Sequence, residues 1–222
     1  MKRRLAIIAG AGPGMGLAIA RRFARGGFDV ALIARDAGRL AESAAEFEGL
    51  GARASVHAAD LSDLAAAEGA IHAIRAARGP AAVLAYNGGA WNQGAPLSMT
   101  AEAFHRDLGL CVSGAYACTR AVHADMAAGG GTVLFTGGGL ALAPGAGVGV
   151  ASLVAGKSGL RGLALVLHEE LKPQGIHVGL VTIAGVVAPG TAFDPDRIAK
   201  AYWDMHIAPR GAWTAETVFR GA

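Results

Sequence analysis

The chain has 222 residues, a length that suits one α/β domain, and 53% of them are apolar while 17% are charged. That composition fills a sizeable core and excludes an intrinsically disordered chain. The net charge is only +3, and beyond the basic start at residues 2–4 the lysines and arginines are scattered. The charge pattern therefore argues against nucleic-acid binding.

The first 20 residues combine a basic head with an apolar run, as a secretory signal peptide does. Four glycines and a proline interrupt this run at fixed spacing, and Arg21 and Arg22 then continue a helical pattern. We therefore interpret the segment as part of the fold. No stretch is long and apolar enough to span a membrane without glycine interruptions.

The two cysteines favour a cytoplasmic location. Cys111 and Cys118 lie seven residues apart in one predicted helix, a separation of about 10 Å that is too long for a disulfide. Reduced thiols are typical of cytoplasmic proteins. The seven histidines show no metal-ligand spacing, so no metal site is expected.

Strands and helices alternate along the chain, as in a parallel sheet that is covered by helices on both faces. Short apolar runs predict six strands, at residues 5–9, 30–34, 54–58, 82–85, 132–136 and 176–182. Apolar residues at helical spacing predict helices at residues 15–26, 39–50, 64–78, 100–126, 151–171 and 195–205. The expected fold is one doubly wound, Rossmann-type α/β domain over residues 1–222, in which residues 186–222 form a substrate lid.

A glycine-rich turn, Ala9-Gly10-Ala11-Gly12-Pro13-Gly14-Met15-Gly16, joins the first strand to the first helix. A strand, a tight glycine turn and a helix together present backbone N–H groups and a helix N-terminus to a pyrophosphate. The spacing Gly-x-Gly-x-x-Gly fails here, because Met15 stands where its third glycine would be. The layout nevertheless predicts dinucleotide binding.

This turn resembles the Thr-Gly-x-x-x-Gly-x-Gly element of the short-chain dehydrogenase/reductase family, with Ala9 in place of Thr. The resemblance covers about residues 5–186 and implies a nicotinamide dinucleotide cofactor. In the resemblance, Gly10 forms the tight turn and Gly14 lets the backbone approach the phosphate. Gly16 lets the helix pack closely on the strand. The cofactor-binding residues that it implies in the turn are Gly10, Gly12, Gly14, Met15 and Gly16.

Later positions follow the same family pattern. Asp60 and Leu61 match the position that contacts adenine, and Asn87-Gly88-Gly89 resembles the family's Asn-Asn-Ala-Gly with Tyr86 replacing the first Asn. Ala184-Gly185 resembles its Pro-Gly turn with the proline lost. The further cofactor-binding residues implied are Asp60, Leu61, Asn87, Gly88, Lys157, Gly185 and Val187.

The end of the second strand favours NADP over NAD. An acidic side chain there binds the ribose 2′-hydroxyl of NAD, but this position is Ala34 and Arg35 follows it. A guanidinium pairs bidentately with a 2′-phosphate. Asp36 takes the acidic role instead if the register is shifted by two residues, so NAD stays the alternative.

Three of the four catalytic side chains that the resemblance implies are missing. Leu153 stands where the family's Tyr-x-x-x-Lys has its Tyr, Gly137 or Gly138 where it has Ser, and Cys111 where it has Asn. Lys157 alone is retained. The nearby hydroxyls of Tyr86 and Thr136 are candidate substitutes, so the candidate catalytic residues are Lys157, Tyr86 and Thr136.

The C-terminus predicts a sheet without the family's seventh strand, because the chain ends at residues 219–222 without the usual Asp-Gly-Gly-like turn. Strand six would then form the edge. Two chains could then not associate through a seventh strand, but they could associate through the helices at 100–126 and 151–171. The second of these helices is rich in leucine. We therefore expect a homodimer that uses these two helices.

Two functions fit these features. The first is an NADP-dependent oxidoreductase that transfers a hydride to or from a small carbonyl or alcohol substrate. The second is a catalytically impaired NADP-binding sensor or partner-binding protein, which the absent Tyr and Ser favour. The fold alone does not choose between them.

Overall fold

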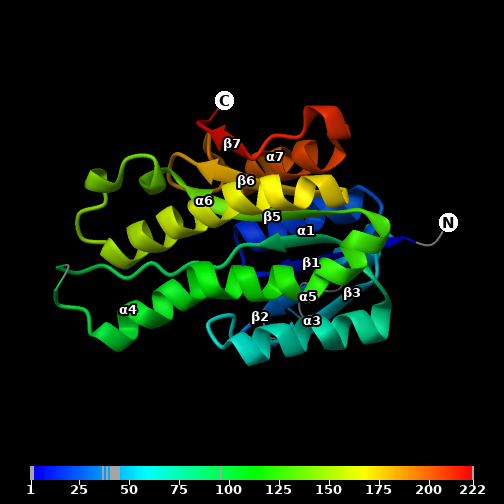
Figure 1. The fold of residues 1–222 in the computed structure, drawn as a ribbon, viewed down its shortest axis with the longest axis horizontal. Coiled ribbons are helices and arrows are strands. Elements are labelled where there is room, and N and C mark those ends of the chain that lie inside the picture. Colours follow the sequence, from blue (N-terminus) through cyan, green and yellow to red (C-terminus); the bar gives the residue numbers. More distant parts are fainter. Residues whose placement is uncertain (1–2, 37, 39, 41–45, 96, 222) are drawn as a thin grey trace.

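The computed structural model describes residues 3–36, 38, 40, 46–95 and 97–221. Its centre is a seven-stranded parallel sheet in the order β3-β2-β1-β4-β5-β6-β7. The strands are β1 (Arg4–Ala9), β2 (Phe28–Ala34), β3 (Ala54–Ala58), β4 (Ala81–Tyr86), β5 (Gly131–Gly138), β6 (Ile176–Ile183) and β7 (Glu216–Phe219). The α/β class and the parallel sheet predicted from the sequence are confirmed (Figure 1).

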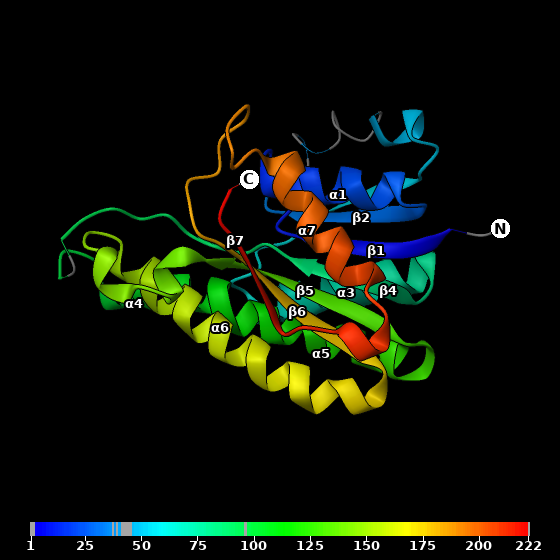
Figure 2. The ribbon, with the colours of Figure 1, turned by 90° about the horizontal axis from the view of Figure 1, so that it is seen from above.

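Helices cover both faces of the sheet, with α1 and α7 on one side and α3, α5 and α6 on the other (Figure 2). They are α1 (Met15–Arg25), α3 (Leu64–Arg78), α4 (Ala101–Leu108), α5 (Gly114–Gly129), α6 (Ala151–Leu171) and α7 (Pro195–Ile207). The helix predicted over residues 39–50 falls partly outside the described residues, and residues 46–49 are helical. None of the helices in the described part of the chain has the length and apolar character needed to cross a membrane.

Two buried clusters form the core, one on each face of the sheet. Along β1, Leu5, Ile7 and Ala9 pack into the cluster under α3, α5 and α6, while Ala6 and Ile8 pack into the cluster under α1 and α7. The alternation follows from the two-residue side-chain period of a strand. Burial on both faces explains why this strand has an apolar run rather than alternating polarity.

The prediction that the seventh strand is missing is wrong. Residues Glu216–Phe219 form β7, which pairs in parallel with β6 from Leu180 to Ile183. Only four residues make this strand, and backbone pairing positions it without any characteristic turn. The Glu216 carboxylate also accepts hydrogen bonds from the Arg161 guanidinium and the Thr182 hydroxyl. Strand six is therefore not the sheet edge.

The long helix predicted over residues 100–126 is interrupted by one π-helical turn, Gly109–Ser113, between α4 and α5. A π-turn shifts the hydrogen-bond ladder by one residue, and such turns occur frequently at functional sites. This turn lies next to the carboxyl end of β4, because the Leu110 carbonyl accepts a hydrogen bond from the Tyr86 hydroxyl.

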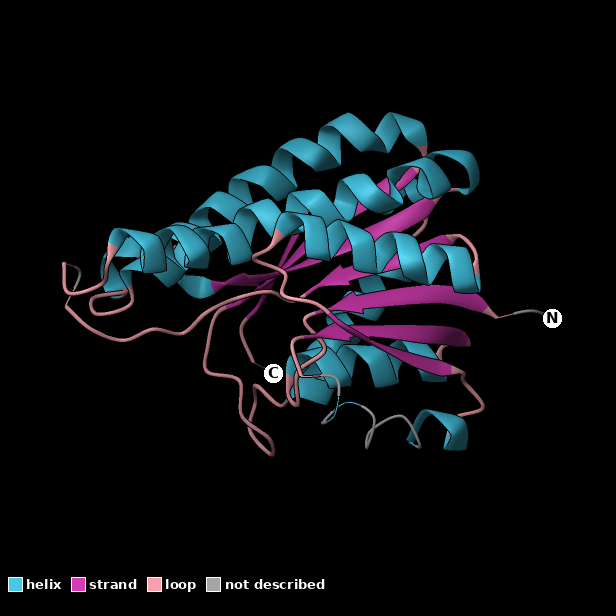
Figure 3. Cartoon of the chain, turned by 90° about the horizontal axis from the view of Figure 1, so that it is seen from below, coloured by secondary structure: helices cyan, strands magenta, loops and turns pink. Residues whose placement is uncertain are grey.

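The sheet order places β1 beside β4, so consecutive connections leave this pair in opposite directions. In open α/β sheets this point of reversal creates a crevice outside the carboxyl ends of the strands, where ligands bind. The loops that follow β4, β5 and β6 extend from the same edge, as the sequence colours of Figure 2 show. Figure 3 shows the sheet and its loops from the opposite side.

Candidate functional site

The glycine turn is open rather than closed by its own side chains. Gly10 has φ +87°, and its N–H and that of Ala11 both donate to the Ile33 carbonyl at 2.9 Å. A Cβ at position 16 would lie 2.4 Å from the Gly10 carbonyl oxygen, so only glycine lets α1 pack this closely. At Gly12 and Gly14, by contrast, an added Cβ would meet no atom within 4 Å.

The helix start next to this turn is uncovered as well. Gly14 is the N-cap of α1 and provides no side-chain hydrogen bond, and the first turn of the helix contains no acidic residue. The partial positive charge of a helix N-terminus then faces outward, which suits a phosphate. Met15, in contrast, is buried in the core, so its side chain serves packing.

A cavity of about 280 Å³ lies beside the turn, at the carboxyl ends of β1, β2, β3 and β4. Seven of the predicted cofactor-binding residues line it together: Gly10, Gly12, Arg35, Asp60, Leu61, Asn87 and Gly88. Residues from four separate strand ends thus converge on one space. Leu110 also lines it, and sequence reasoning missed this residue because only the π-turn brings it there.

The end of the cavity near β2 and β3 is charged. Asp60 accepts hydrogen bonds from the backbone N–H and the hydroxyl of Ser62, and these lower the pKa of its carboxyl, with Arg35 and Arg106 adding to the effect. Arg35 lines the cavity, whereas Asp36 accepts from the Gly38 N–H at 3.1 Å and is not among the lining residues. The arginine, not the acid, therefore lines the cavity.

Asn87 holds the end of β4 against the glycine turn. Its side-chain amide donates to the Gly10 carbonyl at 3.0 Å, and its backbone N–H donates to the Ala9 carbonyl at 2.7 Å. An added Cβ at Gly10 would lie 2.9 Å from the Asn87 carbonyl carbon. The close approach of the two strand ends thus depends on both residues.

Lys157 reaches the same edge of the sheet from α6. Its ammonium donates to the Thr136 carbonyl at 2.7 Å and to the Gly88 carbonyl at 3.1 Å. Burial lowers the pKa of this lysine, and the Cys111 thiol acts in the opposite direction. The ammonium group therefore lies between β4 and β5, next to a residue that lines the cavity.

Tyr86 does not have the position that a substitute proton donor needs. Its side chain is fully buried, and its hydroxyl donates to the Leu110 carbonyl in the π-turn. Burial raises the pKa of this phenol further, with the nearby Cys118 and Cys111 thiols adding to the effect. The geometry instead gives Tyr86 a structural role, in which it satisfies a carbonyl at the π-turn.

Thr136 does not fit the catalytic role either. Its hydroxyl accepts a hydrogen bond from the Tyr202 hydroxyl at 2.7 Å, and Tyr202 belongs to α7 on the other face of the sheet. Only the backbone carbonyl of Thr136 meets Lys157. The side chain is therefore directed away from the lysine.

The positions where the family resemblance implies further protic groups do surround Lys157. A Cβ at Gly138 would lie 3.4 Å from the Cγ atom of Lys157. A Cβ at Gly156 would lie 2.7 Å from the Cys111 sulfur, so the thiol packs directly against α6. The expected serine position thus lies against Lys157, but glycine there provides no hydroxyl.

Sequence reasoning also missed a buried carboxylate beside this region. Asp107 of α4 is buried and accepts hydrogen bonds from the Ser152 hydroxyl at 2.6 Å and the Asn92 amide at 2.7 Å. These donors come from α6 and from the loop after β4. No local pattern reveals such a network, because the partners lie 15 and 45 residues away in the sequence.

The predicted residues Gly185 and Val187 follow β6, outside the cavity. A Cβ at Gly185 would overlap the Phe193 ring, at 2.2 Å, so the glycine lets the chain fold back over this aromatic side chain. Val187 is partly exposed on the same loop. Within the described residues no group of three or more His, Cys, Asp or Glu side chains is arranged to hold a metal ion.

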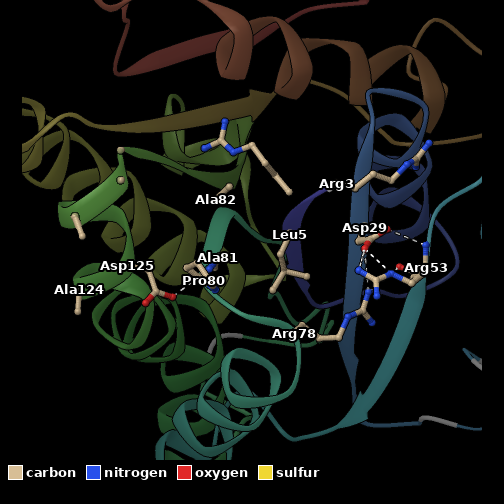
Figure 4. A pocket seen from close by; sticks show the side chains of 14 residues that line it. Arg3, Leu5, Asp29, Arg53, Arg78, Pro80, Ala81, Ala82, Ala124 and Asp125 are labelled. Atoms are coloured by element: carbon tan, nitrogen blue, oxygen red, sulfur yellow. Dashed lines mark hydrogen bonds and ion pairs between the residues drawn. The ribbon is translucent and has the colours of Figure 1, made fainter. Parts of the chain in front are cut away.

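A larger cavity, of about 550 Å³, lies at the opposite, amino-terminal edge of the sheet (Figure 4). There Asp29 accepts from the Arg53 guanidinium at 2.6 and 2.8 Å, with Arg78 at 3.6 Å, and Arg3 donates to three backbone carbonyls. These guanidinium groups already have partners. The edge also lacks the glycine turn, so it does not have the features of a dinucleotide site.

Comparisons with known proteins agree with this geometry. The family model described as short chain dehydrogenase matches residues 4–197. A short-chain dehydrogenase/reductase of Armillaria gallica is 30% identical over 194 residues, which cover 84% of this chain and 72% of that protein.

Two solved structures are similar over nearly the whole chain. One, a metagenomic short-chain oxidoreductase in complex with NADP, is 29% identical with a TM-score of 0.90 and covers 99% of this chain and 97% of its own. The other, a short-chain dehydrogenase from Rhodopseudomonas palustris, is 30% identical with a TM-score of 0.89 and covers all of both chains. The protein therefore belongs to the short-chain dehydrogenase/reductase family of oxidoreductases.

Proposed function

We propose that the protein is an NADP-dependent oxidoreductase that transfers a hydride between the cofactor and a small carbonyl or alcohol substrate. The observation that carries the proposal is the open glycine turn, which faces a cavity lined by Arg35 and by the ends of four strands. The similar metagenomic oxidoreductase, which is in complex with NADP, supports the choice of cofactor.

The residues present fit this cofactor. Gly12 and Gly14 leave open space beside the helix start, where backbone N–H groups would bind the pyrophosphate. Arg35 would pair with the 2′-phosphate, and Asp60 with the Leu61 backbone would contact adenine. Lys157 would bind ribose hydroxyls. NADP, when bound, supplies or accepts the hydride.

Proton transfer is the part of the reaction with the fewest candidate groups. The Tyr86 and Thr136 hydroxyls are directed away from the site, which leaves the Lys157 ammonium, itself held by the Thr136 and Gly88 carbonyls, as the candidate acid retained from the family pattern. Its lowered pKa makes the ammonium a stronger acid than an exposed lysine. A substrate that needs no strong acid, or protonation by water, also suits this site.

A second candidate function is NADP binding without turnover. It is favoured because the Tyr86 and Thr136 hydroxyls already bond to other groups of the protein. A screen of carbonyl compounds for loss of NADPH absorbance at about 340 nm separates the two, because a dehydrogenase oxidises NADPH with at least one class of carbonyl. We expect turnover. Saturable NADPH binding with no turnover across ketones, aldehydes and enones would favour the sensor.

Replacing Arg35 by Ala is expected to weaken NADPH binding about 10- to 100-fold, the loss that corresponds to a charge-assisted hydrogen bond of about 1.5–3 kcal/mol. NADH binding should barely change, because NADH lacks the 2′-phosphate. Fluorescence titration with each cofactor measures the two dissociation constants and their ratio. Arg25→Ala, at the exposed far end of α1, is the control. An equal loss for both cofactors would contradict the assignment of Arg35 to the phosphate.

We propose the lid in narrower form than residues 186–222. Residues 186–194 form the loop at the carboxyl edge, whereas α7 packs Ile198, Ala199 and Tyr202 into the core and β7 belongs to the sheet. Only this loop lies outside the core and the sheet, so we restrict the lid to it, and residues 1–222 act as one domain.

We also propose a homodimer through the helical segments 100–126 and 151–171. Tyr116 on α5 and Val166 on α6 are exposed apolar side chains, and Tyr116 lines a hollow of about 590 Å³ with Leu64 and Leu163. Light scattering at micromolar concentration is expected to give twice the chain mass of 22.2 kDa, and a monomer would refute the pairing.

We propose a cytoplasmic location as well. Both cysteines are free and buried, which supports this location.

A further inference from the structure

The three segments that follow β4, β5 and β6 contain no ionisable side chain. They are residues 88–100, 137–156 and 184–193, and none of them includes Asp, Glu, Lys, Arg or His. Charged residues make up 17% of the whole chain, and surface loops usually carry a large share of them. We name these three segments the neutral rim. Their described residues follow the carboxyl ends of β4, β5 and β6, at one edge of the sheet (Figure 2).

The neutral rim contrasts with the other end of the same edge. There Arg35 and Asp60 line the cofactor cavity, and both Arg35 and Arg106 lower the pKa of the Asp60 carboxyl. The charged end suits the phosphate and adenosine groups of a dinucleotide. The uncharged end is left for the molecule that exchanges a hydride with it.

Large apolar side chains of the neutral rim are exposed to solvent. The exposed fractions are 63% for Trp91, 98% for Leu97, 88% for Val148 and 81% for Val186. Six of the ten exposed large hydrophobic side chains in the described part of the chain belong to these three segments. Exposed apolar groups concentrated on the loops at one edge of a sheet favour an interaction site over ordinary surface.

The polar groups of the neutral rim are themselves uncharged. A cavity of about 150 Å³ between the loop after β4 and the start of α6 is lined by neutral side chains, among them Asn92, Gln93 and Ser152. The nearby Asp107 carboxylate is buried and accepts hydrogen bonds from Asn92 and Ser152. The lining of this cavity is thus neutral, and its Ser152 hydroxyl is already bound to Asp107, so the rim segments carry no cation of their own for an anionic ligand.

We propose that the substrate is a neutral, largely apolar ketone or alcohol, and that molecules with a carboxylate, phosphate or coenzyme A group are excluded. The inference rests on the proposed oxidoreductase function and specifies its substrate class. A carboxylate that enters the rim loses water and gains no positive partner there, because the adjoining Lys157 ammonium is buried and already donates to the Thr136 and Gly88 carbonyls. Each buried methylene, by contrast, increases affinity about fourfold. In reduction, the carbonyl carbon takes the hydride and the oxygen takes one proton, giving the alcohol and NADP⁺.

The test uses the full chain, NADPH and a matched set of ligands: a straight-chain methyl ketone, a keto acid with a carboxylate at its far end, and the methyl ester of that acid. We expect kcat/KM for the ketone and the ester to exceed that for the acid at least about 100-fold, and to rise with chain length. Equal or better use of the acid would overturn the proposal.

A binding measurement keeps the two proposals separate. The same ligands are titrated into the NADPH complex while the cofactor fluorescence and the melting temperature are followed. If NADPH binds but nothing turns over, the oxidoreductase function fails, and preferential binding of the neutral ligands still supports the substrate class. If no neutral ligand changes either signal, the inference about the substrate is wrong.

A charge placed on the rim should reverse the preference. Val148→Lys adds a cation next to Gly149, which lines the cavity of about 150 Å³, and is expected to improve use of the keto acid relative to the ketone at least about tenfold. Ile207→Lys changes another exposed apolar side chain, at the far end of α7, and should leave the ratio unchanged. An unchanged ratio in Val148→Lys would contradict the placement of the substrate at the rim.

Discussion

A glutamate at position 12 is expected to abolish tight NADPH binding without destabilising the fold. Gly12 lines the cofactor cavity, and an added Cβ there meets no atom within 4 Å, so the protein has room for a side chain. The new carboxylate would occupy the phosphate position and repel its charge. We expect the NADPH dissociation constant to rise at least about 100-fold, which corresponds to about 2.7 kcal/mol.

Stability distinguishes this effect from misfolding. The melting temperature of Gly12→Glu without cofactor should equal that of the wild type or exceed it slightly, because an acidic group near a helix N-terminus stabilises the helix by about 0.3–1 kcal/mol. Gly69→Glu is the matched control, since Gly69 is an exposed glycine of α3 with open space around it. Undiminished NADPH affinity in Gly12→Glu would exclude this turn as the phosphate site.

Removing the Asp107 carboxylate should cause a large loss of stability. Asp107→Ala leaves the buried Ser152 hydroxyl without its acceptor, which costs about 1–3 kcal/mol, whereas the amide of the exposed Asn92 can turn to solvent. We expect the free energy of unfolding to fall by about 2 kcal/mol. For a chain of this length the melting temperature should then drop by about 4–8 °C.

Two variants show whether the network itself is responsible. Asp107→Asn keeps one acceptor oxygen and should lose clearly less stability than Asp107→Ala. Asp204→Ala removes an exposed carboxylate that pairs with Lys200 on α7, and should cost less than about 1 kcal/mol. A loss below about 1 kcal/mol in Asp107→Ala would mean that solvent replaces the carboxylate and that the network does not hold the loop after β4.

The sequence predicts the glycine turn and its surroundings well, because the information there is local. Gly10 and Gly16 are required by backbone geometry within a few residues, so their spacing alone indicates the turn. The strands that precede Arg35 and Asn87 are buried apolar runs, whereas β3, before Asp60, is only half-buried. Parallel order follows from the alternation of the strands with helices.

The direction of individual side chains is harder to predict. Tyr86 stands at the end of β4, as expected, but it points into the helix layer of α5 and reaches the π-turn, which no spacing rule anticipates. Thr136 precedes the expected serine position and points to the opposite face, toward Tyr202. Successive side chains of a strand point to opposite faces of the sheet. A hydroxyl one residue away from the catalytic position therefore points away from the site.

The seventh strand illustrates a different limit. Four half-buried residues, Glu216–Phe219, have no apolar run of their own. Their pairing with β6 depends on backbone hydrogen bonds and on the distant partners Arg161 and Thr182 of Glu216. The absence of a familiar turn in the sequence therefore gave no evidence about the strand.

The measurement that tests the central claim most directly is a titration of the wild-type protein with NADPH, followed by cofactor fluorescence and by melting temperature. The account predicts saturable binding of one NADPH per chain and a melting temperature that rises with NADPH concentration, by more than it does with NADH. No change in melting temperature at millimolar NADPH would contradict it, because a cofactor that binds only the folded state must stabilise that state.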